Sequence, residues 1–164
     1  MELEILKKED TPENVIKHSK AVYEKTIVIA SNFENADIEL IKKGVLLHDI
    51  GRSKTHGIRH AVEGAKIVKN YGYSKEVQNI VERHIGAGIS EDEAPELGLP
   101  KKSYVPQTLE EKIVAHADNL ISGAKEVDID FVIDKWQRKI DDPDENIKRL
   151  IKLDNELIKA FEDD

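Results

Sequence analysis

The stretch Leu46-Leu47-His48-Asp49-Ile50-Gly51 decides how the rest of the sequence is interpreted. It places a histidine and an aspartate side by side at the end of an apolar run, and a glycine then closes the run. Imidazole and carboxylate groups are costly to bury unless another group pairs with them. A metal ion is the simplest such partner, so this stretch predicts a helix that ends at a metal site.

Histidine and aspartate also recur on the apolar faces of other predicted helices. Val15, His18 and Val22, for example, are separated by three and four residues and therefore share one helix face. A single histidine on such a face is more often a core residue than a ligand, but here the pattern is repeated on four helices. The residues concerned are His18, His48, His84 and Asp118. This repetition favours one metal site at which several helices meet.

Apolar residues recur at helical spacing through most of the chain, and no segment alternates apolar and polar residues as a strand does. The spacing and the capping residues predict helices over about 12–33, 37–49, 60–70, 74–85, 108–122, 129–140 and 144–162. The expected fold class is therefore all-α, a compact bundle of about six to seven helices. Residues 86–106 contain three prolines and are expected to form a long loop, a kind of segment that is often functional, for example as a lid.

Length and composition narrow the class of protein. A chain of 164 residues is expected to form a single domain, 1–164, with one core. The net charge of −8 argues against a nucleic-acid or acidic-membrane surface. The absence of cysteine excludes disulfides and thiolate metal sites. We find no long apolar run at the N-terminus and no candidate membrane span, and we expect a cytoplasmic protein.

The ordered set of ligand-type residues resembles a known family. His18, His48-Asp49 and Asp118 resemble the H…HD…D signature of the HD-domain metal-dependent phosphohydrolase superfamily, and His48-Asp49-Ile50-Gly51 is similar to its HDIG subtype. The resemblance covers residues 15–123, which it implies are the metal-binding core, and residues 128–164 are expected to add C-terminal helices. It implies an all-α bundle that holds a divalent metal.

Two further histidines extend the resemblance. Members of the superfamily with two additional central histidines generally bind a second metal, and His60 and His84 occupy those places. The resemblance thus implies six ligands: His18, His48, Asp49 and Asp118 for the first metal, and His60 and His84 for the second, with Asp49 bridging. Imidazole and carboxylate ligands suit one or two ions of Mn, Fe, Zn, Co or Ni.

The loop that follows the histidine–aspartate pair carries candidate phosphate-binding residues. Arg52, Lys54 and Arg59 are basic, and arginine offers a bidentate fork to phosphate oxygens. Solvated loop charges are the alternative interpretation of all three. The expected catalytic residues are Asp49, which would orient the attacking water, together with His48 and Arg52.

The expected activity is hydrolysis of a nucleotide or related phosphoester or phosphoanhydride by a metal-activated water. Residues 60–64 and 84–86 are similar to elements of the bacterial HD-type hydrolases of symmetrical dinucleoside tetraphosphates, so a dinucleoside polyphosphate is one candidate substrate. The HD-GYP phosphodiesterases resemble the chain less, since it has no GYP motif. The expected partner is a small phosphorylated molecule. The sequence does not decide whether the protein forms a homo-oligomer.

Two alternatives remain from the sequence. A metal-bound nucleotide-sensing module would bind a nucleotide with little turnover, and an HD-fold di-iron protein would oxidise its substrate with oxygen. Three other residues are expected to be structural: His116 to point away from Asp118, Trp136 to pack the C-terminal helices on the bundle, and Arg83 to face solvent.

Overall fold

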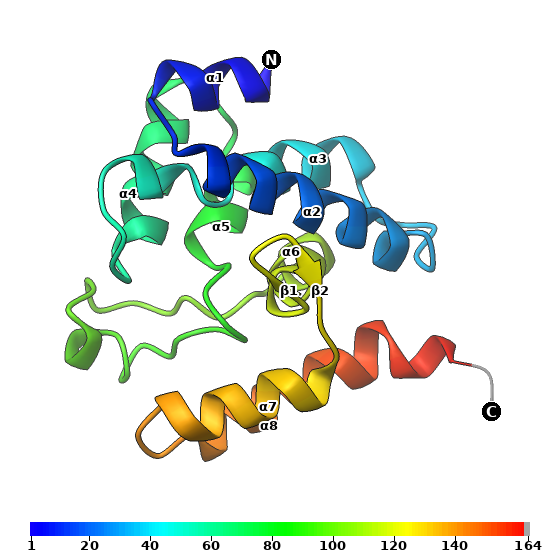
Figure 1. The fold of residues 1–164 in the computed structure, drawn as a ribbon. Helices are drawn as coiled ribbons and strands as arrows, with labels where there is room; N and C mark the ends of the chain where they lie inside the picture. The colour runs from blue at the N-terminus through cyan, green and yellow to red at the C-terminus, as the bar shows by residue number, and fades with distance from the viewer. Residues whose placement is uncertain (163–164) are drawn as a thin grey trace.

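The computed structural model describes residues 1–162 and confirms an all-α fold (Figure 1). The α-helices are α1 (Glu2–Lys8), α2 (Glu13–Ala30), α3 (Ile38–Leu47), α4 (His60–Asn70), α5 (Lys75–Glu82), α6 (Leu109–Asn119), α7 (Ile129–Lys139) and α8 (Asp144–Leu157). Three short 3-10 helices, η1 (Ile50–Ser53), η2 (Pro95–Leu97) and η3 (Lys159–Phe161), and a small antiparallel pair, β1 (Ile121–Ser122) and β2 (Lys125–Glu126), complete the described elements. None of the helices within 1–162 is long and apolar enough to cross a membrane.

Capping side chains fix several helix starts where the sequence predicts them. The side chains of Asp37, Ser74 and Thr108 each accept a hydrogen bond from a backbone N–H in the first turn of α3, α5 and α6. The ends differ more from the predictions. Helices α3, α5 and α6 stop two or three residues early, and Gly123, with φ of 65°, then turns the chain into the β1–β2 hairpin. Helix α1 was not predicted, because seven residues are too few for a periodic pattern.

Helix α6 lies between two groups of helices (Figure 1). On one side it packs with α2, α3 and α5, and on the other side with α8, which also contacts α7. The core is built by aliphatic residues from these helices; Val22, Ile41, Ile113 and Leu150 are fully buried in it. Burial of these aliphatic side chains is the main force that holds the ends of α2, α3 and α6 against one another.

The long segment between α5 and α6 is packed rather than free. Its residues Ile89, Ala94, Leu99 and Tyr104 form a small buried cluster against Val62 of α4. Glu93, within the segment, accepts a hydrogen bond of 2.7 Å from Arg149 of α8. The segment is thus anchored to the bundle at two places, and the structure gives no support to the expectation of a freely moving lid.

Candidate metal centre

The structure brings all six predicted ligands to one place. They come from five separate segments: the middle of α2, the end of α3, the first residue of α4, the residues just after α5, and the end of α6. The ligands in that order are His18, His48 with Asp49, His60, His84 and Asp118. The predicted helix faces therefore do converge, although two of the helices end before the ligand that they deliver.

Asp49 is at the centre of this cluster. Its Oδ2 lies 3.6 Å from the Nε2 atoms of both His18 and His48. Its Oδ1 lies 3.3 Å from Nε2 of His60 and 3.1 Å from Nε2 of His84. Each oxygen of one carboxylate thus faces a different pair of histidines, which is the arrangement that a bridging ligand between two metal ions requires.

Asp118 completes the first of the two groups. Its Oδ1 lies 2.8 Å from Nε2 of His18 and 3.4 Å from Nε2 of His48. The ligand atoms of His18, His48 and Asp118 all lie within 4.8 Å of one another, and so do those of His48, Asp49 and His84. Both sets offer three or more nitrogen and oxygen donors with the spacing that a transition metal uses.

The backbone fixes the tautomer of all four histidines. Each Nδ1 lies at hydrogen-bond distance from a carbonyl oxygen, and a carbonyl only accepts, so each Nδ1 carries the proton. The carbonyls belong to Gly123 for His18, Val45 for His48, Gly57 for His60 and Val81 for His84. With Nδ1 as the protonated atom, a ring that is neutral directs its Nε2 lone pair into the cluster, as metal-bound histidines do.

These lone pairs need a cation. Nε2 of His60 and Nε2 of His84 are only 3.1 Å apart, and neither has a proton to donate in the neutral tautomer. The His48 side chain is fully buried, and its Nε2 has no hydrogen-bond partner. A buried acceptor without a donor is costly. The donor set thus fits one or two divalent metal ions.

The electrostatics of the cluster show how strongly it attracts positive charge. Burial acts to lower the pKa of His48, but the carboxylates of Asp49 and Asp118 outweigh it and raise this pKa to about 9. Burial acts to raise the pKa of both carboxyls, but His48 and the other facing histidines hold both below the ordinary range. The two carboxylates are therefore ionised at neutral pH and ready to bind a cation.

A close approach between two segments sets the second half of the cluster. A Cβ on Gly51 would lie 1.7 Å from the carbonyl oxygen of His60 and 2.7 Å from the backbone nitrogen of Gly64. Only glycine allows η1 and the first turn of α4 to come this near. The glycine that closes the histidine–aspartate stretch thereby places His60 beside Asp49.

The cluster forms the floor of a cavity of about 310 Å³. Arg52 lines it, and its Nε lies 3.4 Å from Oδ2 of Asp49. Lys54 and Arg59 do not line it. The ammonium group of Lys54 lies 3.8 Å from Glu9 of α1, and the Arg59 side chain donates to the Gly98 carbonyl oxygen at 3.0 Å. Of the three predicted phosphate-binding residues, the structure brings only Arg52 to the cluster.

Helix α7 supplies residues that the sequence analysis did not place here. Lys135 and Trp136 line the same cavity, and Trp136 also packs on the core as predicted. The only signal for them in the sequence is that Trp136 is the single tryptophan of the chain. Lys135 adds a second cation to the lining, so the cavity offers two positive groups to an anionic ligand.

The structure also decides the other two structural expectations. His116 points away from the cluster as predicted: its Nε2 lies 2.9 Å from Oδ1 of Asp154, and both side chains are buried. The expectation for Arg83 was wrong. Its guanidinium donates a hydrogen bond of 2.8 Å to the buried Glu111, so the arginine is held against the core instead of facing solvent. The Glu111 carboxylate also accepts hydrogen bonds from the Gln107 N–H and the Thr108 hydroxyl at the start of α6.

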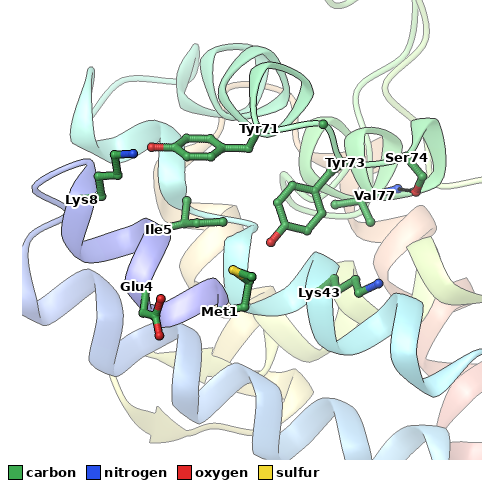
Figure 2. Close-up of a pocket in the computed structure, with 10 residues that line it drawn as sticks. Met1, Glu4, Ile5, Lys8, Lys43, Tyr71, Tyr73, Ser74 and Val77 are labelled. Carbon is green, nitrogen blue, oxygen red and sulfur yellow. Dashed lines mark hydrogen bonds between the residues drawn. The ribbon is translucent and has the colours of Figure 1, made fainter.

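A separate cavity of about 550 Å³ lies between α1 and the turn from α4 to α5 (Figure 2). Its tyrosines serve the fold: the Tyr71 hydroxyl donates to Glu9 and the Tyr73 hydroxyl donates to Glu2, each at 2.8 Å, which ties α1 to the bundle. None of the six ligand residues lines this cavity. The cavity above the histidine–aspartate cluster is therefore the candidate functional site.

Comparison with known proteins agrees with this geometry. The family model described as "HD domain" matches residues 15–123, and the chain belongs to this family. An uncharacterized protein of Methanocaldococcus jannaschii is 52% identical over 149 residues, which cover 88% of each chain. The tRNA (cytidine(56)-2'-O)-methyltransferase of Thermoplasma volcanium is 47% identical over 92% of this chain, but the match spans only 45% of that relative's length.

The fold itself has a solved counterpart. The HD domain of the phosphodiesterase PgpH from L. monocytogenes, in complex with cyclic-di-AMP, superposes with a TM-score of 0.59. The two share 18% sequence identity, and the match covers 98% of both chains. This likeness shows that the described part of the chain, with α7 and α8 included, shares the fold of that HD domain.

Proposed function

We propose that this protein is a metal-dependent phosphohydrolase that acts on a nucleotide or a related phosphoester. The observation that carries the proposal is the position of Asp49, whose two oxygens each face a different pair of histidine Nε2 atoms. Membership of the HD-domain family and the fold shared with a phosphodiesterase domain support it. In this proposal residues 15–123 are the metal-binding core, and 128–164 complete a single domain; of these, 163 and 164 lie outside the described residues.

Each residue of the site has a role in this chemistry. His18, His48, Asp49 and Asp118 hold one metal, and His60 and His84 share Asp49 to hold a second. A divalent metal held here lowers the pKa of water and neutralises charge on phosphate oxygens. Asp49 orients the attacking water, whose oxygen forms the new bond to phosphorus as the bond from phosphorus to the leaving oxygen breaks. One proton of the water ends on the leaving oxygen.

The cations that line the cavity hold the substrate. Arg52 is next to Asp49 and offers two N–H donors to phosphate oxygens. Lys135 lines the same cavity from α7 and adds a compact positive charge. Because the protein carries a net charge of −8, this local pair is what attracts an anionic substrate to the site.

The test is a hydrolysis assay on protein reconstituted with Mn²⁺, using a panel of nucleotides and chromatography of the products. We expect turnover by the wild type and a loss of more than about 100-fold for Asp49→Asn, since even partners of metal ligands cost about 10- to 100-fold. Asp134→Asn is the matched control, because this exposed carboxylate on α7 only pairs with Arg138. Full activity of Asp49→Asn would refute the proposal, and nucleotide binding without any turnover would favour a sensing module instead.

A further inference from the structure

A further cavity, of about 770 Å³, adjoins the cavity above the metal ligands. The latter is called the metal cavity here, and the former the second cavity. The two share three lining residues: Ile85 and Gly86, which follow the metal ligand His84, and Trp136 of α7. The remaining walls come from Ile58, from the segment 87–97, from the turn 140–142 and from α8. The two cavities thus adjoin across these three residues, and each is within the size range of small-molecule sites.

Trp136 stands at the junction of the two cavities. An ideal Cβ on Gly86 would lie 3.5 Å from Cη2 and 3.6 Å from Cζ2 of the indole, which is ordinary van der Waals contact, so the ring packs beside Gly86. The side chain is partly exposed, and it lines both spaces. Ile58 and Ile85 add apolar surface on the far side of the junction. A flat aromatic face beside an apolar wall suits a planar ring.

The two cavities differ in charge and therefore favour different ligand groups. The metal cavity has Arg52 and Lys135 beside its ligands. The second cavity has five carboxylates and one guanidinium: Glu93, Glu96, Asp141, Asp142, Glu145 and Arg149. The single guanidinium is already bound to Glu93 at 2.7 Å. Phosphate groups are therefore repelled from the second cavity, and a neutral group with N–H donors is favoured there.

We propose that Trp136 is the specificity-determining residue at the junction of these two cavities and that it stacks on the heterocyclic base of a nucleotide. The proposal rests on the proposed function: one phosphate lies over the metal ligands, and the base lies in the second cavity. The five carboxylates of the second cavity supply acceptors for the exocyclic amino groups of the base. It also excludes a chain of phosphates, so the substrate class is a nucleoside monophosphate unit rather than a polyphosphate.

Fluorescence of the wild type tests the proposal directly, because Trp136 is the only tryptophan of the chain. The metal-loaded protein is titrated with adenosine 5′-thiomonophosphate, ribose 5-phosphate, inorganic phosphate and ADP. We expect the thiomonophosphate to quench the emission and to bind at least about 10-fold more tightly than ribose 5-phosphate, since stacking on an aromatic side chain has about this effect. ADP is expected to bind more weakly than the thiomonophosphate. Equal binding of the thiomonophosphate and ribose 5-phosphate, with no change in emission, overturns the proposal.

Variants separate the base site from the metal site, with calorimetry as the readout. Trp136→Ala should weaken adenosine 5′-thiomonophosphate binding about 10-fold and leave ribose 5-phosphate binding and metal content unchanged. Trp136→Phe should keep most of the affinity, which guards against misfolding of the alanine variant. If Trp136→Ala binds both ligands as the wild type does while the enzyme still hydrolyses phosphoesters, the base site is wrong and the phosphohydrolase stands. If none of the phosphorylated probes binds or is hydrolysed by metal-loaded protein, both proposals fail together.

Discussion

Two sets of histidine and aspartate in this protein use the same side chains in opposite ways. In the metal centre, the Nδ1–H of each histidine is bound to a backbone carbonyl, and the Nε2 atoms converge on Asp49 and Asp118. In the second set, Nε2 of His116 contacts Asp154 at 2.9 Å, and this one pair joins α6 to α8. His116 and Asp154 are almost fully buried, whereas His18 and Asp118 of the metal centre are partly exposed, with 17% and 20% of their side chains accessible.

The difference teaches how a metal site is distinguished from a structural pair. Asp154 binds Nε2 of the His116 imidazole, whereas Nδ1 of His116 has no hydrogen-bond partner within the described residues. In the candidate metal centre, four imidazoles with fixed Nδ1–H tautomers share two carboxylates, and Nε2 of His60 lies 3.1 Å from Nε2 of His84 although neither nitrogen carries a proton in the neutral ring. In the structural pair one carboxylate faces one imidazole, whereas in the candidate metal centre the inward-facing nitrogens outnumber the carboxylates, and a cation would supply the missing partner.

Gly51→Ala is expected to have the largest effect on the metal centre. The added Cβ would meet the His60 carbonyl at 1.7 Å, and because that atom is backbone it cannot rotate away. We expect a loss of more than about 3 kcal/mol in the free energy of unfolding, measured with urea, and a loss of metal. Gly57→Ala is the matched control, since its Cβ would meet nothing nearer than the Thr55 hydroxyl at 3.8 Å. Equal stability of the two variants would contradict the role given to Gly51.

Asp154→Ala tests the structural pair of His116 and Asp154. It leaves the buried His116 without its partner, and we expect a loss of about 3 kcal/mol in the free energy of unfolding. The number of metal ions per folded chain should not change. Glu156→Ala on the same helix removes only a partly exposed pair with Lys112 and should cost less than about 0.5 kcal/mol. A fall in metal content in Asp154→Ala would show that the two sets are not independent.

Metal removal should lower the free energy of unfolding of the wild type by somewhat less than Asp154→Ala does. A ligand that binds only the folded state at 100 times its dissociation constant stabilises it by about 2.7 kcal/mol. We therefore expect the urea midpoint to rise on addition of Mn²⁺ and to fall on chelation. The Asp118→Asn variant, which lacks a charged ligand of the first group, should show a smaller rise. An identical midpoint with metal and with chelator would argue against a metal that bridges these helices.

Arg52→Ala should give the smallest effect. The guanidinium lines the cavity and is partly exposed, so its loss removes a phosphate contact without disturbing the buried ligands. We expect a rise of about 10-fold in KM for a nucleotide, with metal content unchanged, because one charged hydrogen bond has about this value. Lys54→Ala is the control, since this residue does not line the cavity. Equal effects of Arg52→Ala and Lys54→Ala would indicate that Arg52 is only a solvated loop charge.

The sequence was sufficient to predict which six side chains meet, because helical spacing and the histidine–aspartate pair mark five of them and the resemblance to HD-domain proteins adds His60. Helical spacing places His18 and Asp118 on buried faces, and the histidine–aspartate pair marks the end of α3. The roles of Lys135 and Trp136 depend on how α7 packs over the cavity, which no local pattern contains. Lys54 and Arg59 lie in a segment where apolar residues do not recur at a regular spacing. The sequence therefore did not predict where their side chains point, and only the folded structure shows it.

The measurement that tests the central claim most directly is the number of metal ions per chain. It is made on protein purified without chelator and reconstituted with Mn²⁺ or Fe²⁺, beside the His60→Ala/His84→Ala double variant. Because Asp49 faces two histidine pairs, we predict two ions in the wild type and one in the variant. Equal metal content in both proteins, or no metal in the wild type, would contradict the account.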